Sequence, residues 1–187
     1  ISVRLPPVID NGASTAGWSI PPVGSDFGYW YQTFSSSPSG FQRNLQYSTH
    51  PLNPSNPVGQ RTDLSSFQIV GNDTVYTSYG VDTPLAPAFP AVYNYTGSGI
   101  LSQATDILSV LAWGTDCNGI GYRVSHSTFT PFTGTPASVD VLSRSKLGPD
   151  ATTLANIKAA LVALGNSGIT ALVNAMVAAA QDSGRDG

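Results

Sequence analysis

Residues 27–145 form a succession of short segments that are rich in β-branched and aromatic residues and are separated by turn residues. No long helical pattern lies between them, which argues against a parallel α/β sheet because its strands are usually connected by crossover helices. Two residue pairs typical of tight hairpins, Gly71-Asn72 and Asn118-Gly119, occur among these segments. Eight short antiparallel strands predict a barrel or a sandwich, and we expect them at residues 29–34, 44–48, 66–70, 74–79, 91–95, 106–113, 119–126 and 139–143.

The pattern becomes helical after the last predicted strand. Pro149 and Asp150 begin a helix that is predicted to run to about Leu164, with an apolar stripe at spacings of three and four. A second helix is predicted over residues 169–181 and is apolar on most faces. Such a helix needs cover, so we expect it to pack on the barrel or to form a homodimer contact. The tail, residues 182–187, is expected to fray.

The first 26 residues are rich in Pro, Gly and Ser, which indicates an extended arm rather than a helix. Trp18 is expected to anchor this arm on the body of the protein. The chain is therefore predicted to consist of an N-terminal arm (1–26), a β-barrel (27–146) and C-terminal helices packed on the barrel (147–187).

Charged residues make up only 10% of the chain, the formal net charge is −3, and Lys and Arg form no run. Nucleic-acid binding needs clustered basic side chains that displace counterions, so nucleic acid is not expected as a partner. The same composition argues against a strongly anionic membrane surface. The longest apolar stretch, within residues 169–180, is too short to span a bilayer.

Several features together predict a secreted protein. The chain begins at Ile1 without a signal-peptide pattern, as a mature chain would. Asn72 and Asn94 each begin an Asn-x-Thr sequon, so both are candidate glycosylation sites. The single cysteine, Cys117, cannot form a disulfide within the chain and is expected to be a small buried residue.

Three short motifs occur in the order in which the lipocalin (calycin) family has them. Gly28-Tyr29-Trp30 resembles the Gly-x-Trp signature of the first strand, and Thr115-Asp116-Cys117 resembles the Thr-Asp-Tyr turn with Cys in the Tyr position. The segment 141–145 is similar to the closing strand of the family, whose Arg packs across the Trp. The resemblance covers residues 27–165 and implies a mainly β fold, an eight-stranded antiparallel up-and-down barrel with one or two C-terminal helices. The chain departs from the family pattern in three ways. Cys117 replaces the Tyr of the turn, the chain has no disulfide, and a second helix is predicted after the first.

The resemblance also implies structural roles for five residues. Trp30 would plug the closed end of the barrel, and Arg144 would stack over its ring while its guanidinium caps backbone carbonyls of the first turns. Gly28 belongs to the first-strand motif, and Thr115 and Asp116 belong to the turn motif; all three are assigned structural roles with Trp30 and Arg144. The alternative is an ordinary core Trp and a solvated surface Arg.

An eight-stranded barrel leaves room for one small ligand. By period-two alternation Phe34 shares the inward face of Trp30. Aromatic side chains could stack on a flat cargo, so an organic chromophore is one candidate ligand, although the same residues could merely fill a core. The residues predicted to contact the ligand are Phe34, Phe67, Tyr76, Tyr93, Trp113, Tyr122 and His126.

The leading functional hypothesis is a secreted lipocalin-like protein that binds a small hydrophobic or aromatic molecule, a pigment among the candidates. The alternative is a lipocalin-fold enzyme, an isomerase or dehydratase acting on a small apolar metabolite, which would need an ionisable residue in the cavity: an Asp, His126 or a Tyr. A third hypothesis is an interaction protein that self-associates through its last helix. No catalytic residues, cofactor or metal site are predicted, because two His and one Cys show no ligand spacing.

Overall fold

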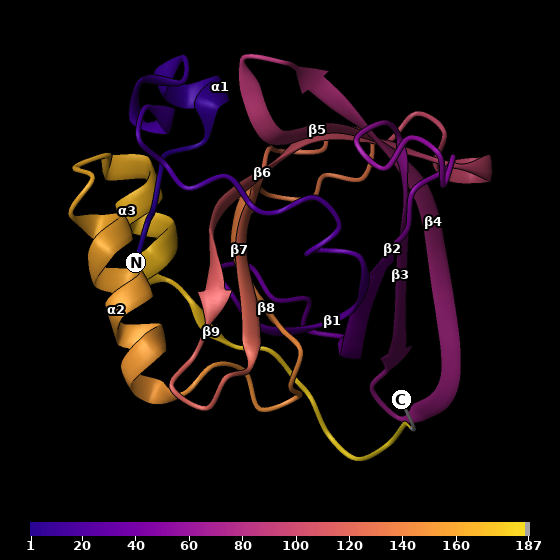
Figure 1. Ribbon diagram of the computed structural model, residues 1–187. Helices are drawn as coiled ribbons and strands as arrows, with labels where there is room; N and C mark the ends of the chain where they lie inside the picture. Colours follow the sequence, from indigo (N-terminus) through magenta and orange to yellow (C-terminus); the bar gives the residue numbers. More distant parts are fainter. Residues whose placement is uncertain (186–187) are drawn as a thin grey trace.

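The computed structural model describes residues 1–185, in which eight antiparallel strands close into a barrel (Figure 1). Each strand pairs with its neighbour in sequence, and β1 pairs with both β2 and β8, so that the sheet closes on itself. The expected eight-stranded up-and-down barrel is confirmed. The strands are β1 (Gly28–Ser35), β2 (Gln42–Thr49), β3 (Arg61–Ile69), β4 (Asn72–Ala86), β5 (Phe89–Gly97), β6 (Thr105–Thr115), β7 (Gly121–Ser127) and β8 (Ser138–Ser143).

Two strands extend well beyond the predicted segments. Strand β3 begins at Arg61 instead of residue 66, and β4 continues to Ala86 instead of residue 79. The added stretches contain Asp, Ser, Gly and Pro, which are rare in strands and hide the hydrophobic alternation. The hairpin between β3 and β4 lies at the expected place, with a two-residue loop in which Gly71 has a φ of +80°.

The β6–β7 turn connects the barrel to the first long helix. The Asp116 carboxylate accepts hydrogen bonds from the backbone N–H groups of Asn118 and Ile120, each at 2.9 Å, and from that of Asp150 at 3.1 Å. Asp150 is the N-cap of α2 (Ala151–Val162) and accepts from the Thr153 N–H at 2.9 Å. Cys117, expected to be buried, is exposed in this turn because it sits at the surface loop rather than in a strand.

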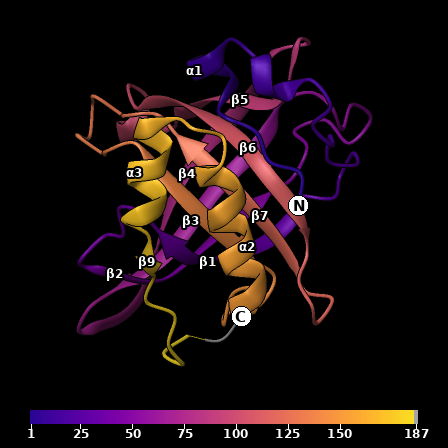
Figure 2. The same ribbon diagram turned by 90° about the vertical axis from the view of Figure 1, so that its left-hand side faces the viewer.

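Helices α2 and α3 (Ser167–Asn174) lie side by side against one outer wall of the barrel (Figure 2). Their inward faces join the strands in one core, in which Ile157, Leu161 and Val173 are fully buried with Val124 and Val141. The apolar side chains of the second helix therefore pack against the barrel of the same chain. None of the helices in residues 1–185 is long and apolar enough to cross a membrane.

The second helix is shorter than predicted. It ends at Asn174, and the following residues form β9 (Val177–Ala178), which pairs with β1. Strand β1 pairs with β2 only from Gly28 to Tyr31, so both strands have unpaired backbone groups further along. The tail supplies the missing partners: the Ala179 N–H donates to the Thr33 carbonyl at 2.9 Å and the Asn44 N–H donates to the Ala180 carbonyl at 2.8 Å. This pairing with the barrel overrides the local helical pattern.

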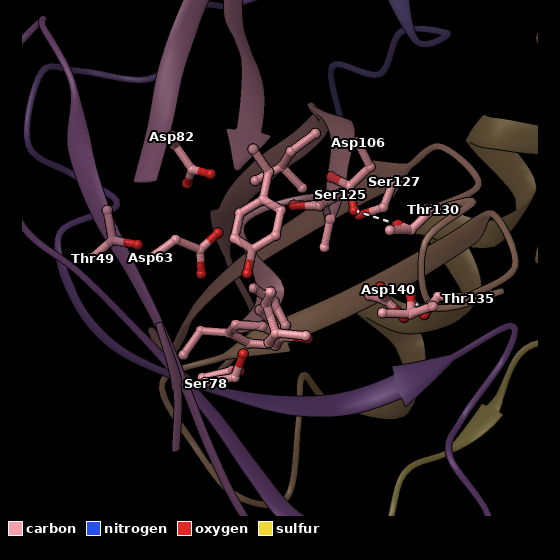
Figure 3. Close-up of a pocket in the computed structure, with 18 of the residues that line it drawn as sticks. Thr49, Asp63, Ser78, Asp82, Asp106, Ser125, Ser127, Thr130, Thr135 and Asp140 are labelled. Atoms are coloured by element: carbon pink, nitrogen blue, oxygen red, sulfur yellow. Dashed lines mark hydrogen bonds between the residues drawn. The ribbon is translucent and has the colours of Figure 1, made fainter. Parts of the chain in front are cut away.

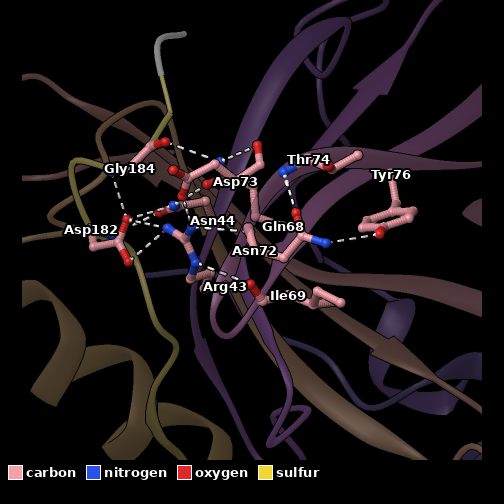
Figure 4. A network of polar contacts seen from close by, with 10 residues as sticks. All are labelled: Arg43, Asn44, Gln68, Ile69, Asn72, Asp73, Thr74, Tyr76, Asp182 and Gly184. Carbon is pink, nitrogen blue, oxygen red and sulfur yellow. Dashed lines mark hydrogen bonds and ion pairs between the residues drawn. The ribbon is translucent and has the colours of Figure 1, made fainter.

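The tail beyond β9 is anchored by a polar network on β2 and β3 (Figure 4). The Asp182 carboxylate accepts from the Arg43 guanidinium at 3.0 and 3.1 Å and from the Asn44 amide at 2.6 Å. The Gln68 amide donates to the Gly184 carbonyl at 3.0 Å, and Arg185 donates to the Asn44 carbonyl at 3.2 Å. Residues 182–185 are therefore held in place, contrary to the expected fraying; residues 186 and 187 lie outside the described part.

The N-terminal arm contains α1 (Pro7–Asp10) and a 3-10 turn, η1 (Ala13–Thr15), where an extended conformation was expected. Pro7 occupies the first turn of α1, where a missing N–H does no harm. Arg4 is completely buried, donates to the Val110 carbonyl at 2.8 Å and lies 3.7 Å from the centre of the Trp18 ring. Trp18 is buried and donates to the Leu111 carbonyl at 3.1 Å, which anchors the arm on β6.

The closed end of the barrel is built around Trp30, which is 5% exposed. The Arg144 guanidinium lies 3.7 Å from the centre of the Trp30 ring and donates to the carbonyls of Tyr29 at 2.7 Å, Phe27 at 2.8 Å and Ser25 at 3.1 Å. Gly28 has a φ of +93°, and a Cβ there would stand 3.3 Å from Arg144 Nη1. These contacts join the first strand, the arm and the last strand at one point.

Candidate functional site

The barrel encloses a cavity of about 280 Å³ (Figure 3). It opens toward the β5–β6 and β7–β8 loops, which contribute Leu101, Ala104 and Thr130 to its wall. The wall is unusually polar for a barrel interior. Its ionisable side chains are Tyr47, Asp63, Asp82, Tyr95, Asp106, Arg123 and Asp140.

Strand alternation explains why polar side chains face inward. On β7, Arg123, Ser125 and Ser127 line the cavity, whereas Tyr122 and Val124 point outward into the core beneath the helices. On β4 the inward positions include Ser78, Gly80 and Asp82. A Cβ on Gly80 would overlap the Tyr95 ring, so the glycine makes room for this ring in the cavity wall.

The carboxyl groups of Asp63 and Asp82 are diagonal neighbours on β3 and β4 and both line the cavity. Burial raises the pKa of both groups, and the negative charge of Asp63 raises that of Asp82 further. Of the two carboxyl groups, that of Asp82 is therefore the harder to ionise. Asp82 is 2% exposed, and its Oδ1 has no hydrogen-bonding partner among the described residues.

The other two carboxyl groups lie on β6 and β8. Burial raises the pKa of Asp106 to about 6, even though the Thr130 hydroxyl donates to its carboxylate at 2.9 Å. Burial also raises the pKa of Asp140, opposed by hydrogen bonds that include one from the Gln32 amide at 3.3 Å and one from the Ser138 hydroxyl at 3.0 Å. Carboxyl groups with raised pKa values can donate as well as accept protons near neutral pH.

Arg123 is the cationic side chain among the residues that line the cavity. Its guanidinium lies 3.5 Å from the Asp26 carboxylate and 5.6 Å from the centre of the Trp30 ring, at the closed end. Asp26 also forms an ion pair with Arg61. The Nε atom of Arg123 is buried without a partner within residues 1–185, and the same is true of the Ser125 hydroxyl.

The aromatic residues predicted to contact a ligand lie outside the cavity lining. A β-bulge between Gln32 and Phe34 shifts the alternation of β1, so that Gln32 faces Asp140 inside and Phe34 packs against the outer core with the helices. Tyr122 belongs to the same outer core. Trp113 donates to the Ser19 carbonyl of the arm at 2.7 Å.

The other three aromatic residues that were predicted to contact a ligand also lie outside the lining of the barrel cavity. Phe67 and Tyr76 are cross-strand partners and stack with ring centres 6.0 Å apart, beyond the cavity toward the β3–β4 turn. Tyr93 shares the inward face of Tyr95, but its ring is covered by Arg61, whose guanidinium lies 4.3 Å from the ring centre. The aromatic walls of the cavity are instead Tyr47 and Tyr95.

His126 lies on the outward face of β7, the face of Tyr122 and Val124. It is 4% exposed, its Nδ1 has no partner in the described chain, and burial lowers its pKa to about 4. Of the two candidate glycosylation residues, Asn94 is exposed on β5, whereas Asn72 is half-buried and donates to the Tyr76 hydroxyl at 3.2 Å. Glycosylation of either remains a prediction.

The cavity residues that sequence reasoning missed share one signal. Polar residues alternate along β3, β4 and β7, as in Asp63-x-Ser65 and Arg123-x-Ser125-x-Ser127. That signal indicates a polar strand face but leaves open whether the face is inside or outside the barrel. No group of three or more His, Cys or Asp within residues 1–185 is arranged to hold a metal ion.

A second cavity, of about 310 Å³, lies at the closed end beneath the arm. It is lined by Trp30, Trp113, Tyr122 and Arg144, and Arg123 separates it from the barrel cavity because it lines both. Its wall includes Trp30 and Arg144, which hold the closed end together, so this second cavity belongs to the closed end of the barrel.

Comparison with known proteins places the chain in a family. No protein-family profile matches it. The chain is 33% identical over 180 residues to Botcinic acid biosynthesis cluster B protein 12 of Botryotinia fuckeliana (strain B05.10), an alignment that covers 93% of this chain and 81% of that protein.

Solved structures at low identity share the fold. Lobster apocrustacyanin A1 superposes with a TM-score of 0.55 at 14% identity, over 84% of this chain and 78% of that one. The siderocalin Ex-FABP gives 0.55 at 12% identity over 84% and 95%, and a biogenic amine-binding protein gives 0.50 at 13% over 85% and 83%. The chain therefore belongs to the same family as the Botryotinia protein, and its barrel has the lipocalin fold.

Proposed function

We propose that this protein binds one small organic molecule in the barrel cavity and that the molecule carries polar groups as well as carbon. The observation that carries this proposal is the set of buried polar atoms without partners that face the cavity: Asp82 Oδ1, Arg123 Nε and Ser125 Oγ. A buried polar atom without a hydrogen bond costs about 1–3 kcal/mol, so a ligand that satisfies several of them gains affinity and a fixed orientation.

The size and wall of the cavity limit the ligand further. About 280 Å³ is at the lower end of the range of ligand pockets, which favours a small metabolite over a long lipid. Leu101, Ala104 and Leu108 offer apolar contacts within the otherwise polar lining. The expected hydrophobic or aromatic cargo is therefore revised to an amphiphilic one. Secretion stays part of the proposal, and the exposed sequon at Asn94 supports it.

Ligand binding is tested by native mass spectrometry of the protein purified from its source, followed by calorimetric titration of the ligand that is released. We expect one molecule per chain. Asp82→Asn changes the cavity wall and should weaken binding, whereas Asp73→Asn changes a carboxylate that is 90% exposed and should leave it unchanged. Equal affinities of the two variants, or no bound molecule and no binding of any amphiphile, would contradict the proposal.

The second candidate is an enzyme on the same barrel that isomerises or dehydrates its ligand. It is favoured by Asp82, whose pKa is raised by burial and by the neighbouring charge of Asp63, and by Asp106, whose pKa is raised to about 6. In a dehydration, the protonated carboxyl group would give its proton to the leaving hydroxyl, and a carboxylate would take a proton from the neighbouring carbon. The Botryotinia relative is named for a biosynthetic cluster, which is compatible with such a role.

Turnover separates the two candidates. A ligand that is recovered unchanged after long incubation supports binding alone. A new product that forms with the parent protein and with Asp73→Asn, but not with Asp82→Asn or Asp106→Asn, supports catalysis. The native source extract is the appropriate substrate mixture, with mass spectrometry as the readout.

A further inference from the structure

The charges inside the barrel are strongly unequal. Four carboxyl groups line the cavity, those of Asp63, Asp82, Asp106 and Asp140, against one guanidinium, that of Arg123. Arg123 is also shared with Asp26 at 3.5 Å, outside the cavity lining. The lining therefore has an excess of acidic over basic side chains.

None of the four carboxyl groups forms an ion pair with a side chain in the described part of the chain. The ion pairs of Arg61 and Arg123 both go to Asp26, and those of Arg43 go to the exterior residues Asp73 and Asp182. Buried carboxylates are normally paired with a cation or coordinated by one. The cavity carboxyl groups depart from that rule together and face one common space (Figure 3).

Two side chains that are more than nine-tenths buried point into this space with unsatisfied oxygen atoms. Asp82 is 2% exposed and Ser125 is 3% exposed, and Asp82 Oδ1 and Ser125 Oγ both lack hydrogen-bonding partners among the described residues. Both oxygen atoms can accept hydrogen bonds. For these two oxygen atoms the missing partner is a donor, whereas the Nε–H of Arg123, at the closed end, needs an acceptor. Beside the carboxyl groups a positively charged donor is favoured most.

We propose that the ligand of the barrel cavity is an organic ammonium ion, a small amine whose charged nitrogen donates to Asp82 Oδ1 in the acidic wall that also includes Asp63 and Asp106. Tyr47 and Tyr95 offer ring faces to the cation, and Leu108 contacts its carbon skeleton. A bare metal ion is a poorer candidate, because no three of the acidic groups within residues 1–185 come close enough together to coordinate one.

This inference rests on the proposed function and names the ligand class of the same site. The test uses three matched series, each an amine, the alcohol and the carboxylate on one carbon skeleton: 2-phenylethyl, cyclohexylmethyl and n-hexyl. Isothermal titration calorimetry at neutral pH measures each affinity on the full chain. We expect at least one amine to bind about tenfold or more tightly than its alcohol, and the carboxylates to bind weakest.

Cavity variants show where the preference comes from. Asp82→Asn and Asp106→Asn should each reduce the ratio of amine to alcohol affinity, whereas Asp73→Asn on the exterior should preserve it. Far-UV circular dichroism checks that each variant folds, and if Asp82→Asn does not fold then Asp106→Asn decides.

The outcomes separate the two proposals. An alcohol or carboxylate that binds as tightly as its amine overturns the ammonium inference but leaves ligand binding by the barrel intact. An amine preference that survives both cavity variants also overturns it. If no member of any series binds and no molecule co-purifies with the protein, both proposals fail.

Discussion

The closed end of the barrel allows a quantitative test through a double-mutant cycle on Trp30 and Arg144. Trp30→Ala removes a nearly fully buried aromatic side chain, which typically costs about 3–5 kcal/mol. Arg144→Ala removes the guanidinium stacked at 3.7 Å and three hydrogen bonds to carbonyls that water can reach in part. We expect it to lower the free energy of unfolding by about 1–3 kcal/mol.

The two losses should overlap, because the stacking contact disappears in either variant. The double variant is therefore expected to cost less than the sum by about 0.5–2 kcal/mol, the range of a cation–π contact. Urea unfolding followed by far-UV circular dichroism supplies the four free energies, and Arg144→Lys, which keeps the charge but loses the planar fork, serves as the control. A coupling energy of zero within error would refute the idea that the stacked pair holds the closed end together.

Three further predictions follow from single features of the structure. Deleting residues 177–187 should lower the free energy of unfolding by on the order of 3 kcal/mol, because β1 and β2 lose their backbone partners; an unchanged urea midpoint would refute this. Because the pKa of Asp106 is raised to about 6, its contribution to the free energy of unfolding should fall as pH rises from about 4 to 6. Because the pKa of His126 is lowered to about 4, its contribution should increase as pH rises from about 4 to 6.5. These contributions are roughly 3 kcal/mol each, so relative to the parent Asp106→Asn should gain stability as pH rises from about 4 to 6, and His126→Gln should lose stability from about 4 to 6.5 in chemical denaturation. Gly80→Ala should displace the Tyr95 ring from the cavity wall and weaken ligand binding measured by calorimetry, and unaltered affinity would contradict that role.

Local patterns in the sequence were sufficient for the eight antiparallel strands, and the three motifs that resemble the lipocalin family indicated a barrel and its closed end. Short alternating segments with turn residues between them identify the strands, and Asn118-Gly119 marks the β6–β7 turn where the structure has it. The start of α2 follows from Asp150, whose carboxylate caps the helix. Such features depend on neighbours within a few residues, and for that reason they can be recognised without the fold.

The conformation of the tail and the register of the first strand depend on contacts between segments that are distant in the sequence. Residues 175–181 have a helical pattern, yet they extend along β1 because that strand has backbone groups to pair. The bulge between Gln32 and Phe34 moves Phe34 from the expected inward face to the outer core. Neither effect has a local signal, since each arises where two strands of the closed barrel diverge or change register.

The chemistry of the cavity was likewise decided by the tertiary structure. Asp106 and Asp140 were recognisable as strand residues, but only barrel closure brings them into one space with Asp63 and Asp82. A period of two shows which residues share a face of a strand and does not show which face is enclosed. The sequence by itself thus determined that a barrel forms, whereas closure, register and bulges determined that its interior is acidic.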